Sequence, residues 1–415
     1  MGAFKLAAVI AVLFVIAVVN DWSAPDKLII TLLAVLAISY VWSRLSLQRL
    51  GMSRSLSLDR VRAGEWVTEE FRISNLGRFP KLWVEVRDLS SLPHHRAGRV
   101  VNLSAVGSTD WSATTRCVSR GRFRLGPITI SSGDPLGLFR VHKSVSVTHE
   151  LVVYPVALDV SRVPLPAASL SGGKAVNRNV AIAAHTISGL REYTSGDPLN
   201  RISWTATART GTMMIKEFDP DPTSDLWVLL DLSESAWTPA DGSTRWTSTS
   251  GSTMAMLDSA EEYAIALTGS VAERALNEGR KVGLIVNRAL PIRLDPDISH
   301  RQWFRIFETL AVATSFGHRS LTEAISAEAS KFSRNSGLVI VTASPSQDWV
   351  GAAEALVHRH VPVTAVIIDS DGTEAQSLQT SSLIESIAAA RIALAVYHRD
   401  QPIPLVGGSG TESAA

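Results

Sequence analysis

Two apolar runs near the N-terminus constrain this chain most. Leu6–Asn20 and Leu28–Trp42 contain no charged side chain. Each is somewhat shorter than the roughly 20 residues that a membrane-spanning helix needs. Basic side chains at their ends, such as Lys5 and Arg44, can reach the water along the helix and relieve the mismatch. We therefore predict two transmembrane helices within residues 1–46.

Charge around these runs predicts an orientation. Asp21 and Asp26 lie between the runs, whereas Arg44 and Arg49 follow the second run. Because basic residues favour the cytoplasmic side, we expect a multi-pass protein of the cell inner membrane with its main domains in the cytoplasm. Two alternatives stay open. A cleaved signal peptide would export the chain, and both helices could instead be buried in a core.

Residues 47–160 alternate apolar and polar side chains over short runs bounded by Gly, Pro and Asn. The runs are Trp66–Ser74, Leu82–Asp88, Arg122–Ile130 and Ser144–Tyr154. Period-two alternation between turn residues is typical of antiparallel strands. We predict one small antiparallel β-sandwich-like domain, followed by a linker over residues 161–188.

Residues 189–405 are expected to form a doubly wound α/β domain, and residues 406–415 a disordered tail. Leu226–Leu232 is an apolar run suited to a buried parallel strand. After it, strands and helices are expected to alternate. The expected elements are helix 257–277, strand 282–287, helix 300–314, helix 321–332, strand 337–342, helix 348–358, strand 361–368, helix 383–390 and strand 393–397. The small and polar run 238–253 is expected to be a flexible insertion.

Composition excludes several classes of function. Forty Lys plus Arg against 39 Asp plus Glu give a net charge of +1, which offers no field to attract nucleic acid. The single cysteine, Cys117, excludes an intramolecular disulfide and a cysteine-based zinc cluster. Common signatures of enzymes, such as the Walker loop and G-x-S-x-G, do not occur in the sequence. We therefore expect an interaction protein rather than an enzyme.

The segment before the α/β domain, residues 189–221, is rich in Gly, Arg, Asp and Trp. Asp197-Pro198 is typical of a helix start, and Thr210-Gly211 of a helix end. Arg191, Arg201 and Arg209 would then surround one helix. Either they pair with nearby acids and fix the helix structurally, or they bind a carboxylate or phosphate of a partner.

This segment resembles the bacterial family catalogued as domain of unknown function 58. The resemblance is carried by Arg191-Glu192-Tyr193, Gly196-Asp197, Arg201-Ile202, Trp204, Ala208-Arg209 and Lys216-Glu217-Phe218. Upstream, Arg120-Gly121, Gly126-Pro127, Asp134–Phe139 and Tyr154-Pro155 also look like that family. The resemblance implies a membrane-tethered interaction module whose partner is a MoxR-type AAA+ ATPase, with a role in assembling or maturing complexes.

The carboxyl end of the first α/β strand carries a candidate metal site. Asp231, Ser233 and Ser235 form D-x-S-x-S, which resembles the metal-ion-dependent adhesion site of von Willebrand A-like domains. Hard oxygen ligands suit Mg²⁺. The resemblance implies a hydroxyl from a second loop, for which Ser320 or Thr322 is the candidate, and an Asp from a third.

The third ligand is missing, because Ala343 stands where the Asp is expected, and the nearby Asp348 looks like the N-cap of the next helix. We expect either a weak or partner-dependent Mg²⁺ site or a purely structural turn. Two other functions remain open: a metal-independent structural scaffold, and a hydrolase that uses Asp197, Arg201 and Arg209.

Overall fold

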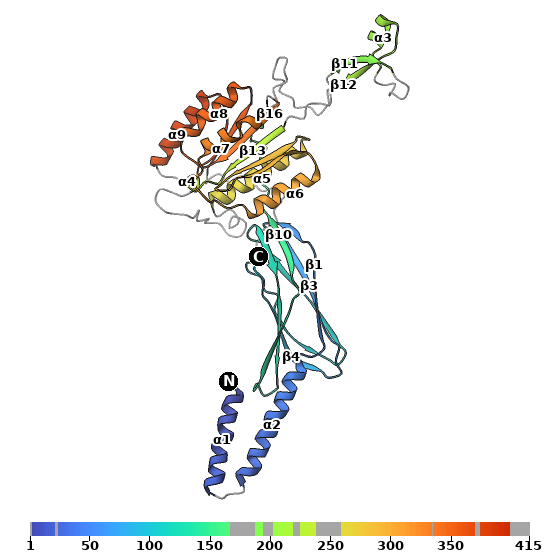
Figure 1. The fold of residues 1–415 in the computed structure, drawn as a ribbon, viewed down its shortest axis with the longest axis vertical. Helices are drawn as coiled ribbons and strands as arrows, with labels where there is room; N and C mark the ends of the chain where they lie inside the picture. Colours follow the sequence, from blue (N-terminus) through green and yellow to red (C-terminus); the bar gives the residue numbers. More distant parts are fainter. Residues whose placement is uncertain are drawn as a thin grey trace, which may run out of the picture. The chain divides into compact units, whose positions relative to one another are not determined.

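The computed structural model divides the chain into two compact units, Met1–Val156 and Ala157–Ala415 (Figure 1). It describes residues 2–20, 24–166, 187–193, 202–218, 225–237, 259–333, 335–369 and 374–398. The expected insertion at 238–253 and the expected tail at 406–415 lie outside these residues.

The first unit begins with two helices, α1 (Gly2–Asn20) and α2 (Ala24–Ser46). Among the described residues, the stretch Lys27–Ser46 of α2 is long and apolar enough to cross a membrane. The apolar stretch of α1, Phe4–Val18, is shorter. The predicted pair of spans is therefore supported for one helix, and the second span remains a proposal.

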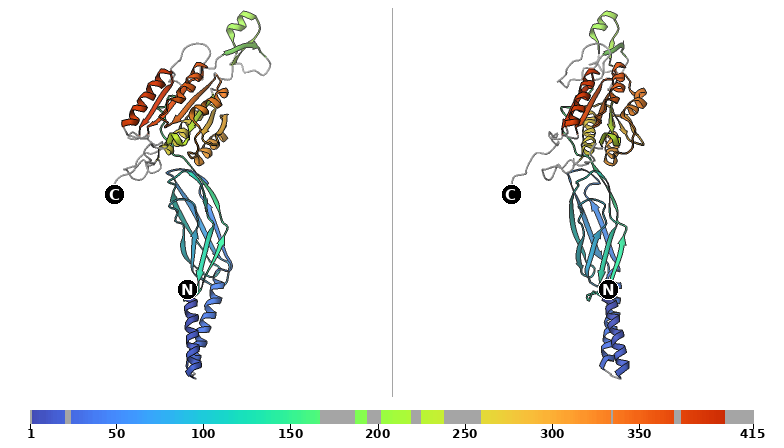
Figure 2. Two further views of the ribbon diagram at one scale, coloured as in Figure 1. Left: turned by 60° about the vertical axis from the view of Figure 1, so that its left-hand side comes forward. Right: turned by 90° about the vertical axis from the view of Figure 1, so that its left-hand side faces the viewer.

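The rest of the first unit consists of β-strands that run along the long direction of this part of the chain (Figure 2). Its strands are β1 (Leu50–Leu56), β2 (Arg60–Arg62), β3 (Trp66–Asn75), β4 (Lys81–Asp88), β5 (Arg99–Leu103), β6 (Ser108–Arg116), β7 (Gly121–Leu125), β8 (Ile128–Gly133), β9 (Arg140–Val145) and β10 (His149–Tyr154). The two larger sheets have the orders β1-β3-β6 and β5-β4-β8-β9, and β2-β10-β7 forms a third. Phe71, Val84, Trp111 and Ile130 come from both larger sheets and share one core, as in a sandwich.

Two of the predicted strands are wrong in extent. Arg122–Ile130 is divided between β7 and β8, and Ser144–Tyr154 between β9 and β10. Gly126 interrupts the first, because its φ of 89° belongs to a region that side chains rarely adopt. The unit is also not purely antiparallel, since β2 and β10 pair in parallel.

The second unit contains a six-stranded sheet with the order β15-β14-β13-β16-β17-β18. The strands are β13 (Asp225–Asp231), β14 (Val282–Asn287), β15 (Ile292–Asp297), β16 (Ser336–Thr342), β17 (Val363–Asp369) and β18 (Ala393–His398). Five of them run in parallel, and β15 pairs antiparallel with β14 at the edge. The predicted parallel sheet is therefore correct for five of its six strands, whereas the antiparallel edge strand β15 was not predicted.

Helices cover the sheet. They are α4 (Glu234–Trp237), α5 (Ala260–Asn277), α6 (His300–Val312), α7 (Leu321–Glu328), α8 (Asp348–His358) and α9 (Glu374–Ala389), with a short 3-10 turn at Ala329–Lys331. Side chains of α7, α8 and α9 share a core with Trp227, Leu229 and Ile340 of the sheet. Figure 1 shows α5 and α6 beside the yellow and orange part of the sheet.

A smaller element, residues 187–218, precedes this sheet. It consists of β11 (Ile187–Glu192) and β12 (Met214–Phe218) as an antiparallel pair, with α3 (Trp204–Thr210) between them. The expected helix start at Asp197-Pro198 lies outside the described residues. Ile202 and Ser203, which were expected to be helical, precede α3. The Ser203 amide instead donates to the carbonyl of Met214 (2.8 Å), which ties this residue to β12.

Candidate functional site

An open pocket of about 930 Å³ lies at the carboxyl edge of the six-stranded sheet, beside β13 and β16. Its lining residues are Asp231, Ser233, Ser320, Leu321, Thr322, Glu323, Ser344, Pro345, Ser346, Gln347, Asp348, Trp349 and Ser382. Strand β13 has β14, the next strand in sequence, on one side and β16 on the other. Such a reversal of strand order at the carboxyl ends is where doubly wound sheets bind ligands.

Asp231 is the centre of the polar network under this pocket and is fully buried. Its Oδ1 accepts hydrogen bonds from the Ser233 hydroxyl (2.8 Å), the Ser233 amide (3.2 Å) and Nδ2 of Asn287 (2.9 Å). Its Oδ2 accepts one from the Thr342 hydroxyl (2.9 Å). Every one of these donors is neutral. Burial therefore raises the pKa of Asp231 above its ordinary value, although the hydrogen bonds partly counteract this.

Two buried polar atoms, one in a residue bonded to Asp231 and one in a residue that lines the pocket, have no hydrogen-bond partner among the described residues. They are Oδ1 of Asn287 and the indole Nε1 of Trp349, which lines the pocket. Buried polar groups normally have partners, and one without a partner costs about 1–3 kcal/mol. Unused hydrogen-bonding capacity therefore lies beside the buried carboxyl group of Asp231, at Asn287, and in the pocket-lining Trp349.

The predicted metal residues converge in part. Asp231, Ser233 and Ser320 line the same pocket, and so does Thr322. Ser235 lies in α4, and its side chain is outside the described residues. Ser320 is the N-cap of α7, where its hydroxyl accepts from the Glu323 amide (3.2 Å).

The third loop has the buried Ala343 where the resemblance implies an Asp, and its nearby acid is Asp348. The predicted cap at Asp348 is off by one residue, because Gln347 is the N-cap of α8 and Asp348 is its first residue. Asp348 accepts from the Ser346 hydroxyl (2.8 Å) and lines the pocket, as does the exposed Glu323. These two acids at the pocket rim were not predicted as site residues.

The residues of the family motif are only partly described. Trp204 and Arg209 lie on α3 and are exposed. Arg191 lies in β11 opposite Ile215, and its side chain is outside the described residues, as are Asp197 and Arg201. The predicted pairing among these residues therefore stays a prediction.

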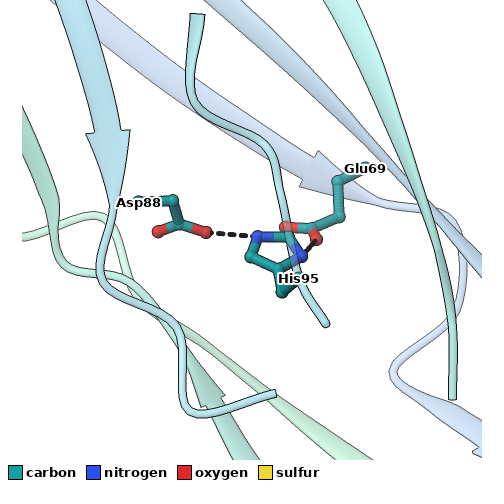
Figure 3. Close-up of side chains that lie close together, drawn as sticks. All are labelled: Glu69, Asp88 and His95. Atoms are coloured by element: carbon teal, nitrogen blue, oxygen red, sulfur yellow. Dashed lines mark hydrogen bonds and ion pairs between the residues drawn. The ribbon is translucent and has the colours of Figure 1, made fainter. Parts of the chain in front are cut away.

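A second cluster of charged side chains lies inside the first unit and was not predicted from the sequence. Glu69, Asp88 and His95 come together there (Figure 3), and ligand atoms of the three lie within 4.8 Å of one another. His95 Nε2 is 2.7 Å from Asp88 Oδ2, and Nδ1 is 3.3 Å from Glu69 Oε1. The side chain of Arg54 is also buried, and it pairs with Glu69 (3.1 Å) and with Asp88.

This cluster is a buried ion-pair network. Burial raises the pKa of Glu69, and the nearby His95 and Arg54 counteract that rise. Arg54 already occupies one side of both carboxylates, where a metal ion would otherwise supply the positive charge. The Arg54 guanidinium also lies 4.9 Å from the ring centre of Phe71, in cation–π contact. The arrangement therefore explains how this core tolerates two buried acids.

Comparisons with known proteins give one family match, one relative and several weakly similar structures. An uncharacterized protein of Bacillus subtilis, YeaD, is 26% identical over 117 residues, which make up 28% of this chain and 29% of that protein. Among solved structures, the CARDB domain of PF1109 from Pyrococcus furiosus is similar with 15% identity, 25% of this chain and 94% of that chain covered, and a TM-score of 0.19. A mutant form of the PilB minor pilin from Streptococcus sanguinis has 10% identity, 86% and 85% coverage and a TM-score of 0.29. Residues 189–378 match the family described as protein of unknown function DUF58, which supports the family resemblance over this part of the chain.

Proposed function

We propose that this protein is a membrane-anchored interaction module whose α/β domain binds an acidic side chain of a partner protein through a weakly held Mg²⁺. The observation that carries the proposal is the fully buried Asp231 beneath a pocket lined by hydroxyl groups at the reversal of strand order. A buried carboxylate surrounded by neutral donors is stabilised by a cation, and hydroxyl and carboxylate oxygens are the ligands that Mg²⁺ prefers.

The strand order of the sheet supports a von Willebrand A-like domain. It combines five parallel strands with one antiparallel edge strand, β15, and the D-x-S-x-S sequence follows the first strand of the sheet, β13. The donor types present fit a divalent ion. Asp231, Ser233 and Ser320 would hold the ion, which would supply a Lewis-acidic positive charge. Because Ala343 provides no acid, a carboxylate from the partner would complete the shell.

The remaining parts of the proposal concern place and partner. Lys27–Ser46 supports anchoring by α2, and the arginines after it support a cytoplasmic location at the inner membrane. We extend this to two spans by including α1. The partner that the family resemblance implies is a MoxR-type AAA+ ATPase, and the exposed Trp204 and Arg209 of α3 offer a second contact for it.

The test is thermal unfolding of the full chain in detergent, with and without Mg²⁺. A ligand at about 100 times its dissociation constant stabilises a protein by about 2.7 kcal/mol. Saturating Mg²⁺ should therefore raise the unfolding midpoint of the α/β unit. Asp231→Asn should abolish the rise. The matched control is Asp295→Asn, which changes an exposed acid on β15, and it should retain the full response.

The pH dependence supplies a second readout. Since the folded pKa of Asp231 is raised, its contribution to stability without metal is greatest below the ordinary value of 3.8 and is lost as pH rises through the folded pKa. A proton competes with the metal over this range, so the Mg²⁺ response should grow with pH. An equal response in the parent and in Asp231→Asn would contradict the metal site. If in addition Asp231→Asn kept every co-purifying protein, a structural scaffold would be the better explanation.

A further inference from the structure

Four loops of the first unit lie together at the end of its sheets where α2 enters (Figure 1). The strand register places them there, because Leu50 pairs with Asn75, Lys81 with Leu103, and Gly133 with Arg140. The Lys81 ammonium also donates to the carbonyl of Leu45 in α2. We call these loops the α2-end rim, which comprises residues 47–49, 76–80, 104–107 and 134–139.

The α2-end rim exposes large apolar side chains. Leu76, Phe79, Val106 and Leu136 are between 63% and 73% exposed. Val106 has a φ of 52°, which is rare for a β-branched residue and costs energy. Four exposed apolar tips on one end of a domain resemble the apolar side of an interfacial membrane contact more than an ordinary solvated surface.

The exposed charges of the rim are all positive. Arg49 and Arg78 are exposed, whereas the acid within the rim, Asp134, is buried. Burial by itself would raise the pKa of Asp134, but hydrogen bonds from the Phe139, Leu138 and Leu136 amides and from Ser39 keep it below its ordinary value. The opposite end of the same sheets exposes acids and bases together, namely Asp59, Glu65, Arg60 and Arg96. The rim is therefore the end that suits an anionic surface.

Contacts with α2 fix the depth of the rim. The Ser39 hydroxyl donates to Asp134, and the Tyr40 and Phe139 rings meet edge to face with their centres 5.5 Å apart. Ser39 precedes the last residue of α2, Ser46, by seven residues, which is about 10 Å along a helix. The stretch that is able to span a membrane ends at Ser46. The loop 134–139 therefore lies beside the last third of that span.

We infer that the α2-end rim is itself a membrane-binding surface, with its apolar tips among the lipid chains and its arginines against anionic headgroups. This inference rests on the proposed anchoring by α2. It adds that the β-unit, which is the part of the first unit from β1 to β10, sits directly on the bilayer, because the rim and α2 are joined by side-chain contacts. Basic side chains near an anionic leaflet gain affinity from its surface potential.

The experiment places an environment-sensitive fluorophore on single introduced cysteines in the full chain. The native Cys117 is fully buried, and burial raises the pKa of its thiol to about 11, so it should not compete for the label. The probes are Phe79→Cys and Leu136→Cys in the rim, Ile38→Cys in α2 and Leu58→Cys at the opposite end. The chain is reconstituted in vesicles of phosphatidylcholine and phosphatidylglycerol with nitroxide-labelled lipid.

We expect blue-shifted emission and quenching by nitroxide for both rim probes and for Ile38→Cys, but neither for Leu58→Cys. Adding Arg78→Glu should move the Phe79→Cys probe toward water in the mixed vesicles, whereas Arg96→Glu, which alters an exposed arginine outside the rim, should not. A quenched probe in α2 with unquenched rim probes would overturn the inference and leave the anchoring intact. Unquenched probes at all four positions would overturn both.

Discussion

Buried acids in the two units are stabilised in opposite ways. Asp231 accepts hydrogen bonds from the neutral groups of Ser233, Asn287 and Thr342. Glu69 and Asp88 instead lie beside Arg54 and His95. Buried acids therefore have neutral donors in one unit and a buried guanidinium in the other. The difference lies in the partners and not in the depth of burial.

Removing the balancing charge should weaken the β-unit strongly. Arg54→Met removes the guanidinium that pairs with both Glu69 and Asp88, and a broken buried pair typically costs about 3–5 kcal/mol. The readout is the rate at which a thiol reagent modifies Cys117, the one cysteine of the chain, which is buried in this unit. We expect a rate increase of at least about a hundredfold, because 1.4 kcal/mol corresponds to a factor of ten.

The control for this experiment is Arg72→Met, which removes an arginine from the neighbouring strand β3. Arg72 pairs with Asp110 (2.8 Å), but both side chains are more than half exposed. Exposed pairs contribute little, so the labelling rate should stay that of the parent. Equal rates for the two variants would mean that the network contributes nothing to the stability of the unit.

At the scale of elements, the sequence predicts what periodicity encodes. The predicted bounds of β14 and α8 agree with the structure, because their ends coincide with changes in polarity. The edge strand β15 was not predicted, because Pro296 and the acids on either side of it are not typical of a strand. Proline is nevertheless tolerated in a strand at the edge of a sheet. The start of α3 was misjudged because the tie between Ser203 and β12 is a tertiary contact.

The candidate site was predictable to a similar degree. Asp231 and Ser233 were found because they follow an apolar strand. Asn287 and Thr342 were missed, yet each is the polar last residue of an apolar strand, and that signal was available in the sequence. The cluster around His95 was out of reach, because its members come from distant segments and follow no local pattern.

Arg274 makes most of the side-chain hydrogen bonds that hold the segment leading into the α/β unit, and Ser270 and Thr364 make one each. Arg274 of α5 donates to the carbonyls of Val160 (2.7 Å), Ser161 (3.3 Å) and Val163 (3.0 Å). Each such bond contributes about 0.5–1.5 kcal/mol, so Arg274→Gln should free this segment and make proteolytic cleavage within residues 157–166 roughly tenfold faster. Arg293→Gln, which alters an arginine on β15, should leave cleavage unchanged. A parent-like rate in Arg274→Gln would show that other contacts hold the segment.

At the scale of the whole molecule, the number of spans decides on which side of the membrane the N-terminal residues and the β-unit lie. If α2 alone crosses, the N-terminal residues and the β-unit lie on opposite sides. If α1 crosses as well, both lie on the same side. The apolar stretch of α1, Phe4–Val18, is shorter than the span of α2, but Lys5 can reach the headgroups from its end. Tilt and local thinning of the bilayer relieve a mismatch of this size at modest cost.

We expect the two-span arrangement, and single introduced cysteines test it. The native Cys117 is buried and should not react with the reagent. Phe4→Cys reports on the N-terminal end and Leu58→Cys on the β-unit, and both native side chains are exposed. A maleimide that cannot cross membranes is added to intact cells and to inverted membrane vesicles. Two spans with cytoplasmic domains predict that both cysteines react only in inverted vesicles, because the positive residues hold both on the inner side. Reaction of Phe4→Cys in intact cells and of Leu58→Cys in inverted vesicles would mean that α2 is the single span, and the bilayer would then have to accommodate α1 on the outer side.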